Sequence, residues 1–143
     1  MPSLLENLNV LLADREVVVS LAARIGGSEA DAESAVGPAL ARIIDGLAAL
    51  AADEAGTVRY LIDRHGTAVP GDLADHLAEM RTTSGNVILD RVFGAERGLV
   101  VIGLASGLGL APSLVGRLLP LLAPIVAAEV ANRRQAEDLD LVE

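Results

Sequence analysis

Apolar and polar positions alternate along the chain with the period of an α-helix. In the clearest segment the apolar residues recur at intervals of three and four, namely Val17, Val18, Leu21, Ala22 and Ile25. Because 3.6 residues make one helical turn, this spacing gathers them on one side of a helix. Asp14 is a favourable N-cap, and Gly26-Gly27 is a stop signal. The pattern therefore predicts a helix between Asp14 and Gly26.

Similar start and stop signals divide the rest of the chain into further helices, about seven or eight in all. The other expected ranges are 3–13, 28–53, 57–65, 72–80, 86–93, 95–107 and 112–134. A kink or restart is expected at Pro38, and bends are expected at Pro120 and Pro124, because proline removes a helical hydrogen bond. Residues 81–85 are expected to form a loop.

One segment of the chain is repeated. The stretch Val17–Gly26 reappears 83 residues later as Val100–Gly109, and each copy precedes a turn and a long segment rich in Ala, Leu and Val. Self-similarity of this kind indicates one supersecondary unit that is used twice. The sequence therefore predicts a pseudo-repeated helix–turn–helix unit whose two copies are buried halves of one globule.

The composition favours helices over strands. Of the 143 residues, 52% are hydrophobic but only 1% are aromatic, so the core has to consist of Leu, Ile, Val and Ala. Ala and Leu are the strongest helix formers. We therefore predict an all-α, compact multihelical single domain over residues 1–134, followed by an acidic, frayed C-terminal tail at 135–143.

Charge and residue usage limit the partners. The net charge is −9 and the eleven basic residues are all Arg, so electrostatic binding to nucleic acid is not expected. The scarcity of aromatic residues also removes the usual base-stacking platform. The absence of Cys excludes disulfides and thiolate metal sites, and no metal or cofactor motif is present. The N-terminus has no basic region typical of a signal peptide, which makes the cytoplasm the expected location.

One stretch is long enough to cross a membrane. Residues 98–116 contain no charged side chain, and Gly103-x-x-x-Gly107 is a close-packing motif of membrane helices. However, Gly107, Gly109 and Pro112 fall where the first copy turns, and they divide the stretch into two segments. We therefore expect two short buried segments rather than membrane insertion.

Several motifs resemble the YidB-like family, bacterial proteins that carry a domain of unknown function. They are the residues 118–126 (Leu-Leu-Pro-Leu-Leu-Ala-Pro-Ile-Val), 3–8 (Ser-Leu-Leu-Glu-Asn-Leu), 88–94 (Ile-Leu-Asp-Arg-Val-Phe-Gly) and 109–110 (Gly-Leu). The resemblance spans roughly residues 3–134 and implies a compact multihelical bacterial domain. The family has no established reaction, so the resemblance implies no catalytic residue.

The charged centre of the chain holds the candidates for catalysis. They are His65, Asp63, Tyr60, His76 and Asp72. Asp72 and His76 are four residues apart, and a carboxylate beside an imidazole is the pair that general base catalysis uses. The alternative is that these residues form i, i+4 pairs on solvated helix faces.

Arg117 is the candidate ligand-binding residue. It interrupts an otherwise apolar stretch between Gly98 and Ala128. A buried guanidinium there needs a carboxylate partner or an anionic ligand. The alternative is that its aliphatic stem lies along apolar surface while its charge reaches water.

Two classes of function remain open at this point. The first is a non-catalytic interaction or structural module that binds a protein partner or itself through the Gly-rich second copy, with Gly94, Gly98, Gly103 and Gly107. The second is a small-molecule-binding protein or an enzyme, such as a biosynthetic enzyme, with a small apolar ligand in an aliphatic pocket between the copies. Whether the protein is an enzyme is left open by the sequence.

Overall fold

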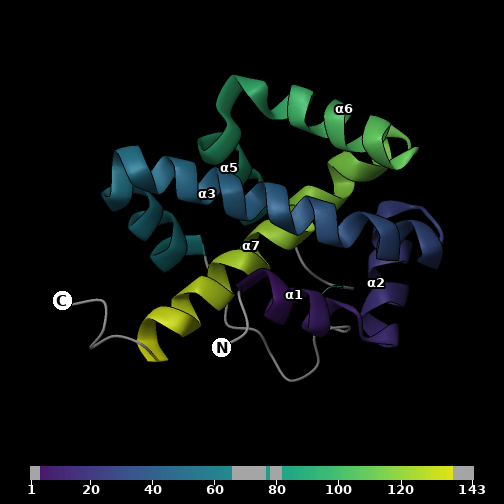
Figure 1. Cartoon of the computed structure of the whole chain (residues 1–143), viewed down its shortest axis with the longest axis horizontal. Helices are drawn as coiled ribbons and strands as arrows, with labels where there is room; N and C mark the ends of the chain where they lie inside the picture. Colours follow the sequence, from purple (N-terminus) through teal and green to yellow (C-terminus); the bar gives the residue numbers. More distant parts are fainter. Residues whose placement is uncertain (1–3, 66–76, 78–81, 137–143) are drawn as a thin grey trace.

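Helices make up nearly all of the described part of the protein, which confirms the predicted all-α fold. The computed structural model describes residues 4–65, 77 and 82–136; it is 91% helical, and no strand occurs among those residues. They form six α-helices: α1 Leu4–Leu12, α2 Arg15–Ile25, α3 Glu29–His65, α5 Thr83–Phe93, α6 Arg97–Leu108 and α7 Pro112–Ala136. A 3-10 turn, η1 (Gly94–Glu96), joins α5 to α6 (Figure 1).

The helix count in this part of the chain is lower than the seven or eight predicted. The ranges expected at 28–53 and 57–65 are both helical and share the label α3, which has 37 residues; they meet at a kink at Glu54 (φ −139, ψ 65), so the break predicted after Asp53 is confirmed. The kink precedes Gly56, which is not among the described glycines with positive φ, namely Gly26, Gly94 and Gly109. The helix expected at 72–80 lies outside the described residues except for Leu77.

The described helices continue through their prolines, so the restart expected at Pro38 does not occur, whereas the bends expected at Pro120 and Pro124 stay predictions. The interruption of α3 lies at Glu54 rather than at Pro38, and α7 runs as one helix through Pro120 and Pro124. Proline removes a hydrogen bond but keeps φ close to the helical value, so a helix that is held by its packing can continue through it. Such packing holds α7, whose residues 118–128 are all buried.

The two copies of the repeated sequence have the same backbone structure at the turn that ends each helix. Gly26 ends α2 in the left-handed conformation (φ 77), and the amide of Gly27 donates to the carbonyl oxygen of Ala22 at 3.1 Å. Both features recur 83 residues later. Gly109 has a φ of 70, and the amide of Leu110 donates to the carbonyl oxygen of Ala105 at 2.9 Å. This is the Schellman arrangement of a helix C-terminus, which glycine adopts without steric cost. The predicted break within residues 98–116 is therefore confirmed.

The core lies where α3 and α7 cross (Figure 1). These two helices share the most extensive contact of any two described elements, and α1, α2 and α5 pack around them. Among the described residues, two segments, Glu29–Glu54 and Pro112–Val130, are long and apolar enough to cross a membrane by length and composition. A buried core helix meets the same criterion, and the second segment is mostly buried within the protein.

The second copy is not buried as predicted. α6 lies along the upper edge of the molecule in Figure 1 and contacts α7, α5 and α3 on one side. Only Val100 and Ala105 of this helix are buried. The apolar residues of α6 surround its whole circumference, so their pattern does not specify an inward side. Half of the helix consequently faces solvent.

Candidate interaction surface

The residues predicted for catalysis lie mostly outside the part that the structure describes. Tyr60 is on α3, and its side chain is 58% exposed. Asp63 and His65 belong to the last turn of α3, but their side chains are outside the description, as are Asp72 and His76 altogether. Their clustering therefore stays a prediction. Among the described residues, no group of three or more His, Asp or Glu could hold a metal ion.

Arg117 lies on α7, and its side chain is exposed. Its Nη1 donates to the carbonyl oxygen of Ile25, at the end of α2, at 3.2 Å. The last carbonyls of a helix lack intrahelical donors and carry partial negative charge, so a guanidinium there is favourable. Arg117 thus caps α2 from α7, a role that its place in the sequence does not indicate.

The solvent side of α6 is the most distinctive described surface. Its exposed residues, which we call the α6 outer face, are Gly98, Leu99, Ile102, Gly103, Ser106 and Gly107. Leu99 is 69% exposed and Ile102 is 57% exposed, and none of the six residues is charged. Leu99, Ile102, Gly103 and Ser106 follow the i, i+3, i+4, i+7 spacing of a stripe that fits another helix.

The orientation of α6 is fixed by contacts at its start and along its inner side. Arg97 donates to the carboxylate of Asp90 at 2.8 Å and to the side-chain oxygen of Asn86, both on α5. Val100 and Ala105 are buried in the core. These contacts hold the opposite side of the helix outward, so exposure of the α6 outer face follows from the packing of its neighbours.

The glycines of the α6 outer face have no role in the packing of the single chain. A Cβ atom placed on Gly98, Gly103 or Gly107 would meet nothing within 4 Å. Gly85 is the opposite case, because its Cβ would lie 1.9 Å from the carbonyl oxygen of Pro120. Each exposed helical glycine costs about 1 kcal/mol relative to alanine. Three such glycines on one face therefore call for an explanation outside the folding of this chain.

The first copy of the repeat provides an internal comparison. Val17 and Ala22 of α2 are buried, as are their equivalents Val100 and Ala105. The positions of α2 that match the α6 outer face are Arg15, Glu16, Val19, Ser20, Ala23 and Arg24. Three of these six residues are charged, whereas none is charged in α6. The two copies share an inner side and differ in the outer one.

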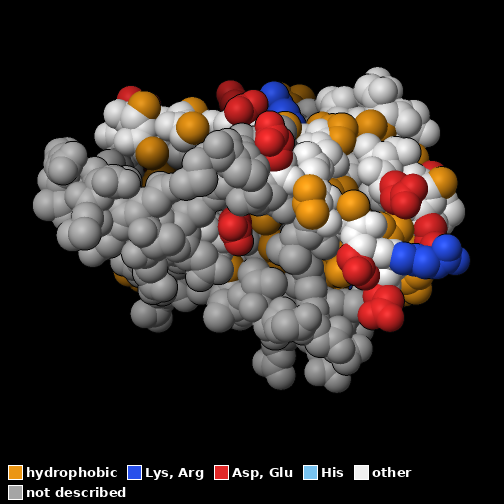
Figure 2. Space-filling model, turned by 60° about the horizontal axis from the view of Figure 1, so that its bottom comes forward, with side chains coloured by type: hydrophobic (Ala, Val, Ile, Leu, Met, Phe, Trp, Pro, Cys, Tyr) orange, Lys and Arg blue, Asp and Glu red, His pale blue; other side chains and the backbone are white. Residues whose placement is uncertain are grey.

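On the face drawn in Figure 2, charges interrupt the apolar surface of the described residues. Figure 2 shows one face on which carboxylates lie at several separate places between apolar side chains. Isolated apolar side chains on a surface are ordinary, whereas an uncharged helix side is a sign of an interaction site. The sequence predicted a flat apolar face from its glycines but not the outward position of Leu99 and Ile102. A position-by-position comparison of α6 with α2 indicates this outward position, because charged residues of α2 lie at the equivalent positions.

Comparison with known proteins identifies a family but not an activity. Residues 9–133 match the family described as a bacterial protein of unknown function, DUF937. No curated protein and no solved structure matches the chain. The match covers most of the chain and includes three of the four motifs that suggested the resemblance, at residues 88–94, 109–110 and 118–126; the motif at residues 3–8 lies before it. The chain therefore belongs to the YidB family, a family of bacterial proteins of unknown function.

Proposed function

We propose that this protein is a non-catalytic interaction module that self-associates through the α6 outer face. The observation that carries the proposal is an exposed helix side with Leu99, Ile102 and three glycines at which a Cβ would meet nothing within 4 Å, in a chain of net charge −9. A second helix placed there would cover Leu99 and Ile102 and would use the glycines for close approach of the two backbones.

The α6 outer face is complementary to itself when two copies run antiparallel. A two-fold axis between Ile102 and Gly103 would set Ile102 opposite Gly103 of the other copy and Leu99 opposite Ser106. Gly98 would then lie opposite Gly107. Each large side chain meets a small one, so the helices could interdigitate without voids. This complementarity favours a second copy of the chain over an unrelated helix as the partner.

The size of the surface limits the strength of the association. α6 has 12 residues and is therefore about 18 Å long. One helix side of that length is smaller than the surface that stable complexes bury. We therefore expect a reversible dimer with a dissociation constant of roughly micromolar to millimolar.

Sedimentation equilibrium over a wide concentration range tests the proposal. We expect the average mass to rise towards that of a dimer, and Ile102→Glu to keep the protein monomeric, because two carboxylates would be desolvated beside the two-fold axis. The matched control is Val19→Glu, since Val19 is 44% exposed at the equivalent position of α2. A wild-type protein that stays monomeric to about millimolar concentration, or a control that acts like Ile102→Glu, contradicts the proposal.

A further inference from the structure

The α6 outer face holds no group that titrates, although it belongs to a strongly acidic chain. None of its six residues has an ionisable side chain, and the whole stretch from Gly98 to Gly116 is uncharged. The chain nevertheless has 20 Asp and Glu residues against 11 Arg. A change in pH therefore leaves the contacts available on this surface as they are and changes only the charges around it.

The charges next to α6 are nearly balanced. α6 meets α7 near Gly116, and α3 meets the end of α5 near Gly46. In the described part of the chain, the charged residues around these contacts are Asp90 and Arg91 on α5, Glu96 on η1, Arg97 on α6, Arg117 on α7, and Arg42 and Asp45 on α3. They comprise three acids and four arginines, so the excess behind the net charge of −9 lies elsewhere on the chain.

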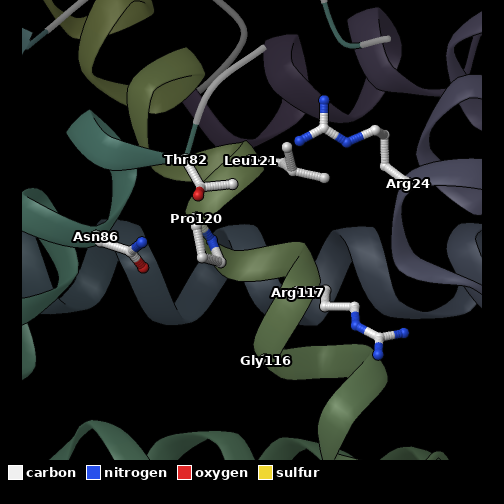
Figure 3. Close-up of a pocket in the computed structure, with 7 residues that line it drawn as sticks. All are labelled: Arg24, Thr82, Asn86, Gly116, Arg117, Pro120 and Leu121. Atoms are coloured by element: carbon white, nitrogen blue, oxygen red, sulfur yellow. The ribbon is translucent and has the colours of Figure 1, made fainter. Parts of the chain in front are cut away.

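Arg117 also borders a pocket, which adds no titrating group to these surroundings. Figure 3 shows its side chain directed away from Arg24, Thr82 and Asn86, the other polar residues of that pocket. Its guanidinium instead donates to the carbonyl oxygen of Ile25. None of the residues that line the pocket is Asp, Glu or His. Lowering the pH to about 5 therefore leaves the charge of the pocket lining unchanged.

Repulsion between two copies of the protein consequently acts at long range rather than within the proposed contact. It grows with the square of the net charge, and at an ionic strength of about 10 mM the Debye length of about 30 Å lets it act across a whole dimer. As the pH falls from 7 towards the isoelectric point of about 4.6, carboxylates and imidazoles take up protons. The net charge thereby moves from −9 towards zero, and the repulsion decreases.

We propose that acid tightens the self-association of this protein through the α6 outer face, so that pH regulates the dimer. The inference rests on the proposed function and adds the regulation of the same surface. Uptake of protons removes repulsion, whereas the contacts of Leu99, Ile102 and the glycines are the same at every pH. The dissociation constant should therefore fall continuously from pH 7 to the isoelectric point.

Sedimentation equilibrium of the wild type at pH 7 and pH 5, both at an ionic strength of about 10 mM, tests the inference. The net charge is roughly halved over this range, and we expect the dissociation constant to fall at least about tenfold. Ile102→Gln should associate more weakly than the wild type at both pH values, whereas Val19→Gln should follow the wild type. Equal association of Ile102→Gln and the wild type at pH 5 would show non-specific attraction and would overturn the inference.

Charge variants at pH 7 give a second measurement that needs no change of pH. Together, Glu16→Gln, Glu33→Gln and Asp53→Asn remove three exposed carboxylates outside α6, which changes the net charge from −9 to −6 and should lower the dissociation constant. Removal of two exposed arginines by Arg15→Gln and Arg59→Gln changes it to −11 and should raise the dissociation constant.

The two measurements separate this inference from the proposed function. A wild-type protein that stays monomeric at both pH values contradicts self-association itself. A dimer that Ile102→Gln weakens, but whose dissociation constant changes neither with pH nor with the charge variants, leaves self-association in place and overturns its regulation by acid.

Discussion

At the scale of single residues, the glycines inside the described helices include two contrasting kinds. Gly85 is buried where the start of α5 lies against the backbone of α7, and there is no room for a side chain. Gly103 and Gly56 lie in helices with open space where a Cβ would be. Gly85 is required by close packing, whereas Gly103 and Gly56 are not, and substitution by a larger residue distinguishes the two cases.

Gly85→Ala should destabilise the protein by about 1–3 kcal/mol or more, because its Cβ would overlap the carbonyl of Pro120 and separate α5 from α7. Urea unfolding followed by circular dichroism measures the change. Gly56→Ala is the matched control, and it should be neutral or stabilising by up to about 1 kcal/mol. Equal effects of the two substitutions would show that the close approach at Gly85 is not rigid.

Gly103→Gln should change stability and association in opposite directions. Glutamine is a better helix former than glycine and meets no neighbour within the chain, so unfolding of the monomer should cost about 0.5–1 kcal/mol more. The same side chain should hinder close approach of a second α6, and the dissociation constant should rise. Gly56→Gln should change stability alone. Dilute-solution unfolding and sedimentation measure the two quantities, and an unchanged dissociation constant for Gly103→Gln contradicts the proposed role of the glycines.

At the scale of elements, Arg97 holds the start of α6 against α5 through Asp90 and Asn86. Arg97→Gln should therefore destabilise the protein by about 1–2 kcal/mol, because it removes charge-assisted hydrogen bonds to both residues. Asp90→Asn should cost less than about 1 kcal/mol, since Asp90 is exposed and its ion pair is screened by solvent. Hydrogen exchange should show faster opening of α6 in Arg97→Gln. A larger cost for Asp90→Asn than for Arg97→Gln would contradict this order.

The sequence predicts some elements of the fold well because their signals are local. Asp14, Gly26 and Gly109 act through their own backbone and nearest neighbours, so α2, α6 and their turns begin and end close to the predicted residues. The kink of α3 at Glu54 also lies close to the end predicted at Asp53. The burial of Val58 and Leu61 beyond the kink depends instead on contacts with other elements, which the local pattern does not contain.

The α6 outer face shows the same limit of prediction from local sequence signals. Apolar residues on all sides of α6 indicate a helix but not its inward side, so the sequence predicts burial where the structure places half of the helix in solvent. The hydrogen bond from Arg117 to Ile25 joins α7 to the end of α2, and no spacing within one helix indicates it. The charged centre that held the catalytic candidates lies largely outside the described residues.

At the scale of the whole molecule, net charge opposes the proposed dimer. Two copies of charge −9 repel each other, and an uncharged face is where contact meets the least local repulsion. Raising NaCl from about 10 to about 150 mM shortens the Debye length from about 30 Å to about 8 Å, so the dimer should become tighter. Sedimentation equilibrium at the two salt concentrations measures this. A dimer that weakens with salt would indicate an interface of ion pairs rather than the α6 outer face.

The most direct test of self-association through α6 uses the absence of native cysteine. In single-cysteine variants, Ile102→Cys lies beside the proposed two-fold axis, whereas two copies of Ser106→Cys would lie about 10 Å apart along the helices, too far for a disulfide. Under mild oxidation, Ile102→Cys should form a covalent dimer, and Ser106→Cys and the matched Val19→Cys should stay monomeric. Failure of Ile102→Cys to form a dimer faster than Val19→Cys would contradict the proposed interface.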